Sequence, residues 1–94
     1  MITQEDVPGE GQRAPTFGEY KVGIAFNPGN NPKVDELKRK AADFIDAVEA
    51  ISQGTPDNPM PDHQYREVGR LKALAITHAE DAAMWAVKAA TKPV

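Results

Sequence analysis

The residues whose types and spacing point most directly to chemistry are two lysines and a Phe-Asn pair. Lys88 and Lys92 are four residues apart in an alanine-rich stretch, so on a helix they would lie one turn apart on the same face. Phe26 and Asn27 directly precede a turn sequence. A flat aromatic, an amide able to read a base edge and two cations suit a small phosphorylated ring compound.

Residues suited to catalysis or metal binding are scarce. The chain has two histidines and no cysteine, which excludes a thiol nucleophile and a cysteine-based zinc site. His78, Glu80 and Asp81 lack the one-face spacing of a metal-binding Glu-x-x-His helix. The single serine, Ser52, has no base beside it. We therefore expect a binding protein with no catalytic residue, no metal and no cofactor.

Two helices are expected to position the candidate residues. The stretch NPGNNP at 27–32 is turn chemistry that ends in a helix start, because Asn31 can cap and Pro32 suits the first helical position. This first helix is expected to end at Gly54. A second helix is predicted from Asp62 to about Thr91.

Apolar residues at spacings of three and four mark one stripe on each helix. The stripe of the first is Val34, Leu37, Ala41, Phe44, Val48 and Ile51, with Ile45 widening it. The stripe of the second is Val68, Leu71, Ala75, His78, Ala82, Trp85 and Ala89. The short connector between them predicts an antiparallel pair.

The fold predicted from these elements is all-α. We expect a flexible or strap-like extended arm over 1–20 and an antiparallel two-helix hairpin domain over 21–94, with KVGIAF at 21–26 as a short extended candidate. At 1.5 Å per residue the helices would be ~30 Å and ~45 Å long, so the C-terminal tip of the second should extend past the first. A lone hairpin buries little apolar surface, which favours assembly as a homo-oligomer.

The hairpin should also separate its charges. Acidic residues collect at the turn end, and the open end receives the positive dipole end of the first helix. The cations of the open end are Lys33, Lys38, Arg39, Lys40, Lys88 and Lys92. The net charge of −3 argues against non-specific binding of long nucleic acid. No apolar run nears the roughly 20 residues of a membrane span and no signal pattern is present, so we expect a cytoplasmic protein.

Each of these features also has a simpler structural explanation. The helix dipole alone favours lysines near a helix C-terminus, and the lysines and arginine at 38–40 can form a solvated face. Phe26 can be a core plug, and Trp85 can be a core or interface residue. Two other functions therefore stay open: a structural or adaptor oligomer that binds an acidic protein partner, and a nucleotide hydrolase.

The second predicted helix carries a longer pattern. It reads Arg70-x-Lys72-x-Leu74-Ala75-x-Thr77-x-x-Glu80-x-Ala82-x-Met84-Trp85-Ala86 and closes with Lys92. Over roughly residues 24–92 the chain resembles the phage-encoded cyclic-nucleotide sponges that inhibit CBASS and Thoeris immunity. The resemblance implies a homo-oligomer, commonly a hexamer, in the host bacterial cytoplasm. It would sequester cyclic di- or trinucleotides or cyclic ADP-ribose isomers without cleaving them.

The resemblance also implies roles for individual residues. The family has an aromatic-polar-Pro loop whose aromatic stacks on a base, and Phe26-Asn27-Pro28 resembles it. A basic residue closing the last helix contacts phosphate in a second, inter-subunit site in some members, and Lys92 matches it, with Lys88 one turn earlier.

This chain departs from the family pattern in two places. The usual loop has Tyr then His, with one more residue before Pro, and the usual basic residue early in the first helix is replaced by Val34-Asp35. Lys33 or Lys38 would have to take over that charge. The expected ligand-binding residues are Phe26, Asn27, Pro28, Lys33, Lys38, Lys88 and Lys92.

Overall fold

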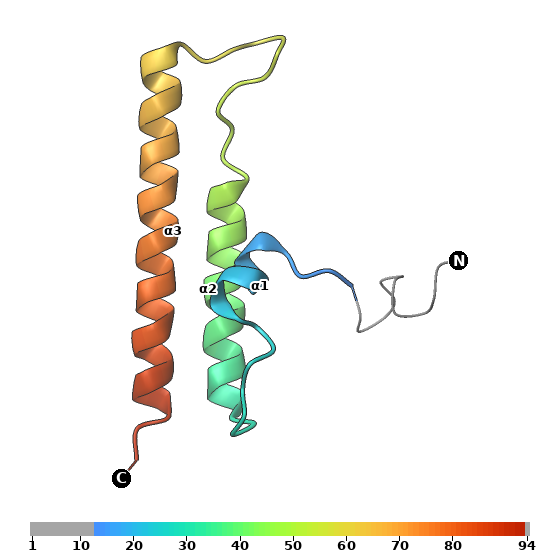
Figure 1. The fold of residues 1–94 in the computed structure, drawn as a ribbon, viewed down its shortest axis with the longest axis vertical. Coiled ribbons are helices and arrows are strands. Elements are labelled where there is room, and N and C mark those ends of the chain that lie inside the picture. Colours follow the sequence, from blue (N-terminus) through green and yellow to red (C-terminus); the bar gives the residue numbers. More distant parts are fainter. Residues whose placement is uncertain (1–12, 94) are drawn as a thin grey trace, which may run out of the picture.

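The computed structural model describes residues 13–93, and three helices account for most of that range. They are α1 (Phe17–Val22), α2 (Pro32–Glu49) and α3 (Asp62–Ala90). α2 and α3 run antiparallel side by side, and α1 packs mainly against α2 (Figure 1). No strand forms within the described residues. The all-α hairpin prediction is therefore confirmed, with one short helix added, while the oligomeric state stays a prediction.

The additional helix α1 shows that the predicted extended segment at 21–26 is wrong. Thr16 begins α1 with a capping box, in which its side chain accepts the Glu19 N–H at 3.1 Å and the Glu19 carboxylate accepts the Thr16 N–H at 2.9 Å. Gly23 ends the helix in the left-handed conformation, with φ at 61°. Residues 1–12 of the predicted arm lie outside the described residues, and residues 17–20 are already helical. The division of the chain at residue 20 stays a prediction.

α2 begins where the sequence predicts and ends earlier. The Lys33 N–H donates to the Asn31 side-chain oxygen at 2.8 Å, and Pro32 is the first helical residue. The helix ends at Glu49 rather than near Gly54. Its end is stabilised by the Lys72 ammonium of α3, which donates to the carbonyls of Glu49 at 3.0 Å and Ile51 at 2.6 Å.

The buried face of α2 is shifted from the predicted stripe. The buried residues are Val34, Lys38, Ala42, Ile45 and Val48. Phe44 and Ile51, which the stripe includes, are about half exposed. α2 packs against α1 as well as α3, so two neighbours decide which residues are buried. Ile45 and Val48 form the core with Ile76 of α3.

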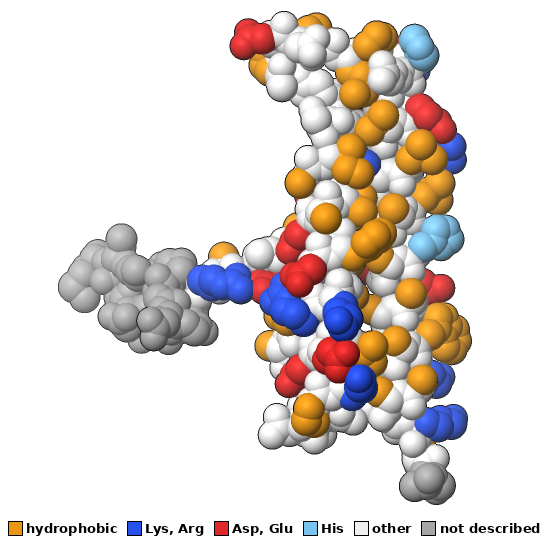
Figure 2. Space-filling model, turned by 180° about the vertical axis from the view of Figure 1, so that it is seen from behind, with side chains coloured by type: hydrophobic (Ala, Val, Ile, Leu, Met, Phe, Trp, Pro, Cys, Tyr) orange, Lys and Arg blue, Asp and Glu red, His pale blue; other side chains and the backbone are white. Residues whose placement is uncertain are grey.

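α3 also packs through a different face from the one predicted. Its buried residue is Ile76, and Ala75 and Ala79 pack beside it against the core. The members of the predicted stripe that are exposed are Leu71, His78, Ala82, Trp85 and Ala89. Figure 2 shows hydrophobic side chains along the length of this helix. α3 therefore keeps an apolar surface that no part of residues 13–93 covers.

The difference in helix length is accommodated at the connector end, opposite to the prediction. Because the Lys72 side chain reaches the end of α2, the first turns of α3 extend beyond that end. The connector 50–61 runs along these turns, where the Gln53 side-chain amide donates to the Tyr65 carbonyl at 3.1 Å (Figure 1). The C-terminal end of α3 lies level with the start of α2 (Figure 1). The predicted overhang of the C-terminal tip is therefore wrong.

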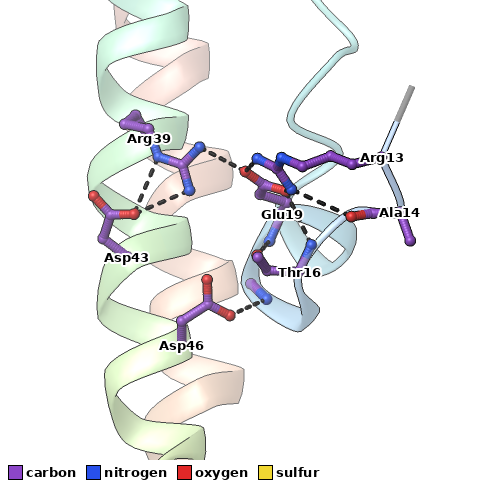
Figure 3. Close-up of polar contacts among 8 residues, drawn as sticks. Arg13, Ala14, Thr16, Glu19, Arg39, Asp43 and Asp46 are labelled. Atoms are coloured by element: carbon purple, nitrogen blue, oxygen red, sulfur yellow. Dashed lines mark hydrogen bonds and ion pairs between the residues drawn. The ribbon is translucent and has the colours of Figure 1, made fainter. Parts of the chain in front are cut away.

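A buried carboxylate joins α1 to α2. Glu19 is 4% exposed and accepts two hydrogen bonds from Arg13, at 2.8 and 2.7 Å, and one from Arg39 at 2.7 Å (Figure 3). Arg39 also pairs with Asp43 at 2.9 Å. The Arg13 and Arg39 guanidiniums, together with the Thr16 N–H, hold the pKa of Glu19 far below its usual range. Arg39, one of the expected open-end cations, is thus neutralised within the fold.

Folding stability should fall in acid because of Glu19. Its pKa is lower in the folded than in the unfolded chain, so its stabilisation is complete above the ordinary value of 4.5 and is lost as the pH falls below it. We expect Glu19→Gln to lower the melting temperature at pH 7 by roughly 5–10 °C and to flatten its decline between about pH 5 and pH 3. Melts followed by circular dichroism measure this.

The control for that experiment is Glu67→Gln. Glu67 is exposed, and its one ion-pair partner among residues 13–93 is Arg70, at 2.7 Å, so Glu67→Gln should change the melting temperature by no more than about 2 °C. If Glu19→Gln kept the full acid dependence of the unsubstituted protein, Glu19 would not be its source.

Candidate functional site

A cavity of about 570 Å³ lies at the open end of the hairpin, between the loop after α1 and the end of α3. Five of the seven predicted ligand-binding residues line it: Phe26, Asn27, Pro28, Lys38 and Lys92. Val34, Val87 and Ala90 add apolar surface. The structure therefore brings the loop and the C-terminal cation together as expected, and the roles of these residues in binding stay predictions.

The other two predicted residues do not line this cavity. Lys33 pairs with Glu36 at 2.7 Å on the exposed side of α2, which lowers the pKa of that carboxyl. The Lys88 ammonium lies 5.4 Å from the centre of the Trp85 ring, a cation–π distance. Within one copy of the chain, both lysines thus have other partners.

Phe26 is exposed, which rules out its role as a core plug within the described chain. The residue is 72% exposed. Its backbone N–H donates to the Gly23 carbonyl at 2.9 Å and closes a turn directly after α1. The Lys38 ammonium lies 5.4 Å from the ring centre. A ring held at a cavity edge in this way is available for stacking.

Lys38 is buried, contrary to the alternative of a solvated lysine face. Its side-chain ammonium donates to the Gly23 carbonyl at 2.9 Å and, through a short hydrogen bond, to the Phe26 carbonyl. The residue is 7% exposed. Among residues 13–93 no carboxylate lies within ion-pair distance of it. Lys38 therefore contributes an unpaired positive charge to the wall of the cavity.

Asn27 is largely committed to the loop itself. Its side-chain NH₂ group donates to the Asn31 carbonyl at 2.8 Å and to Asp35 at 2.9 Å, while its side-chain oxygen accepts the Asn31 N–H at 3.1 Å. Both amide donors are thus used within the chain, which leaves only acceptor capacity for a ligand. The Asn27–Asp35 contact was missed by sequence reasoning, because it depends on how the loop closes.

Comparison with known protein families identifies the domain. The family model of the Acb2/Tad1 hairpin domain matches residues 19–91. This chain belongs to the Acb2/Tad1 family. At the family level this implies phage anti-defence proteins that sequester cyclic nucleotides, known for binding their signals rather than for catalysis. The search of curated proteins and that of solved structures each found no match.

The match to the Acb2/Tad1 hairpin domain includes every residue that lines the open-end cavity except Lys92, which directly follows it. It begins inside α1, so Arg13 and Thr16, which anchor that helix, precede the matched region. Thr77 and Glu80 of the α3 pattern line a second cavity of about 690 Å³ between α1 and α3, where Lys21 pairs with Glu80 at 3.2 Å. Lys38 lines this cavity too, so it lies between the two.

Over residues 13–93, no group of three or more His, Asp or Glu side chains could hold a metal ion. His78 is exposed on α3 rather than packed in a seam. None of the helices in the described range is both long and apolar enough to cross a membrane.

Proposed function

We propose that this protein binds a cyclic di- or trinucleotide, or a cyclic ADP-ribose isomer, and thereby removes a second messenger of CBASS or Thoeris defence without cleaving it. The observation that carries the proposal is the open-end cavity, where an exposed aromatic ring and an unpaired buried cation meet inside the family domain. Its volume of about 570 Å³ lies in the usual range for small-molecule sites.

The chemistry of the cavity suits the two parts of such a ligand. Phe26 offers a face for a base, and base stacking on an aromatic ring depends little on base identity. Lys92 offers positive charge for a phosphate. Sequestration then works by mass action, so it needs affinity of around nanomolar and abundant protein rather than turnover.

We further propose that the binding form is a homo-oligomer, with a hexamer as the expected state. Its support is the uncovered apolar surface of α3, whose large members are Leu71, Leu74, Met84 and Trp85. Trp85 alone is 56% exposed, and aromatic side chains of this kind commonly anchor interfaces. In such an assembly Lys88 and Lys92 of neighbouring copies would face shared pockets. Light scattering after size-exclusion chromatography tests the assembly.

Calorimetry with a panel of signals tests the function. The panel is cyclic di-AMP, 3′,3′-cyclic GMP–AMP, cyclic tri-AMP and cyclic ADP-ribose. We expect tight binding of at least one member and recovery of that ligand intact after the complex is heated. Recovery of a linear product in place of the cyclic ligand would show that the protein is an enzyme. Absence of heat with every member would contradict sequestration of these signals and favour the adaptor alternative.

Lys92→Ala is expected to weaken binding of the panel ligand about 3- to 10-fold, because it removes one charge from the cavity wall. The control is Arg66→Ala, which removes an exposed cation near the connector end of α3 and should leave the affinity unchanged. Equal losses in both variants would indicate a general charge effect, and calorimetry at two salt concentrations would detect it.

A further inference from the structure

Lys38 is linked to the Phe26 loop in three ways. Its ammonium donates to the carbonyls of Gly23 and Phe26, the two ends of the turn that follows α1, and it lies 5.4 Å from the centre of the Phe26 ring. The Gly23 carbonyl also accepts the Phe26 N–H, so the lysine reinforces the hydrogen bond that closes the turn. The anchor comes from α2, a helix that also packs against both of the others.

Burying a lysine in this way is costly. A charged ammonium loses its hydration when it is buried, and the usual compensation is a carboxylate. Over residues 13–93 Lys38 has none, and its compensation is two carbonyl dipoles and an aromatic face. An aliphatic side chain would fill the same position on the buried face of α2 without the cost of burying a charge. The hydrogen bonds to the turn are therefore the distinctive contribution of a lysine here.

The remainder of the loop has an anchor of its own. Asn27 binds Asn31 and Asp35 and so fixes residues 27–31 to the start of α2. These contacts do not reach the turn at residues 23–26. Lys38 is the side chain that joins this turn to α2. The position of the Phe26 ring therefore depends on Lys38.

We propose that Lys38 is a positioning residue for ligand binding, which acts through Phe26 rather than by contacting a ligand phosphate. It holds the turn so that the ring stays outside the core, with the ammonium near one face and the ring available to stack on a base. A ring that is ordered before binding costs less conformational entropy when the ligand arrives. This inference rests on the proposed function and assigns Lys38 a role different from that of Lys92.

The test is a double-mutant cycle with Phe26→Ala and Lys38→Met, using 3′,3′-cyclic GMP–AMP and the other three panel ligands as probes. We expect Lys38→Met alone to weaken binding about 10-fold. We expect the double variant to bind no more weakly than Phe26→Ala, because a residue that acts through another adds nothing once that one is gone. The salt dependence of binding should change less than it does in Lys92→Ala, because no direct contact with a ligand charge is removed.

Lys72→Met is the matched control. The Lys72 ammonium also donates hydrogen bonds to two backbone carbonyls, at the opposite end of α2, so Lys72→Met removes a similar set of interactions. Because these lie far from the Phe26 turn, we expect the affinity to change less than 2-fold. Additive losses in the cycle, or a salt dependence reduced as strongly in Lys38→Met as in Lys92→Ala, would overturn the inference in favour of a phosphate contact. Unchanged affinity in Lys38→Met would overturn it as well.

A ligand-free measurement separates this inference from the proposed function. Hydrogen exchange at the Phe26 N–H reports the turn directly, and it should become faster in Lys38→Met but not in Lys72→Met. Unchanged exchange would overturn the anchoring role even if ligands bind. Failure of the unsubstituted protein to bind any of the four probes would instead reject the proposed function, and with it the link from Lys38 to binding.

Discussion

Phe26→Ala is expected to weaken binding of the cyclic nucleotide by about 10- to 100-fold and to leave the melting temperature nearly unchanged. Stacking of a base on an aromatic ring contributes roughly 1–3 kcal/mol per base when measured by alanine substitution. Phe26 is 72% exposed, so removal of its ring deletes little packing. Phe26→Ala should therefore lower the affinity for the ligand without lowering the melting temperature of the protein. Calorimetry and thermal melts of the same preparation measure both.

Phe44→Ala is the matched control for Phe26→Ala. Phe44 is also an exposed phenylalanine, at 53%, and it lies on α2 outside the lining of the open-end cavity. Its substitution should leave affinity within about 2-fold of the starting value. Phe26→Tyr, which keeps the aromatic ring, should bind well. Normal affinity in Phe26→Ala would show that the base does not stack there.

The helix boundaries were predictable from sequence where local chemistry determines them. Asn31 and Pro32 are a cap and a first-turn residue whatever the rest of the fold does, and α2 begins there. α3 was predicted from Asp62 to about Thr91 and spans Asp62–Ala90. These positions depend on residues within one turn of each other. That is why a single sequence was sufficient to find them.

α1 was not predictable in the same way. Its six residues are too few to be stable as an isolated helix. It is held by contacts that are distant in the sequence, from Glu19 to Arg39 and from the Gly18 N–H to Asp46. A segment rich in proline and glycine gave no periodic signal of this helix. The capping box at Thr16 and Glu19 was the one local sign, and it resembles many turn sequences.

The stripe of α2 was misjudged because the prediction counted apolar residues alone. Lys38 lies on the buried face, where its ammonium is satisfied by the Gly23 and Phe26 carbonyls. A pattern of apolar residues alone leaves out Lys38, and it therefore passes through Phe44 rather than through Ala42, which is the buried residue one turn from Lys38. A buried polar residue is defined by its partners, and these are tertiary contacts. The placement of the loop at 26–31 beside the end of α3 was still predictable, because an antiparallel pair of helices must bring these two segments to the same end.

The largest effect on stability is expected for Gly18→Ala, at about 2–4 kcal/mol of lost folding free energy. Gly18 is where α1 approaches α2 most closely: its N–H donates to the Asp46 carboxylate at 2.7 Å, and an added methyl group would overlap the Ala42 carbonyl oxygen. In a helix with free space, Gly→Ala stabilises by roughly 0.5–1 kcal/mol instead. The sign of the effect therefore tests the packing of α1, and chemical denaturation measures it.

Gly29→Ala provides the comparison, because a methyl group at Gly29 would meet nothing within 4 Å. The stability of Gly29→Ala should change little, and Gly18→Ala should show the large loss.

Gly18→Ala should also affect the ligand site. The helix α1 is closed by Gly23, and the Gly23 carbonyl is one of the two that accept hydrogen bonds from Lys38. If α1 moves off α2, this turn loses its anchor and Phe26 its fixed position. We therefore expect Gly18→Ala to weaken ligand binding even under conditions where the variant remains folded. A stable variant with unchanged affinity would contradict the packing of α1 on α2.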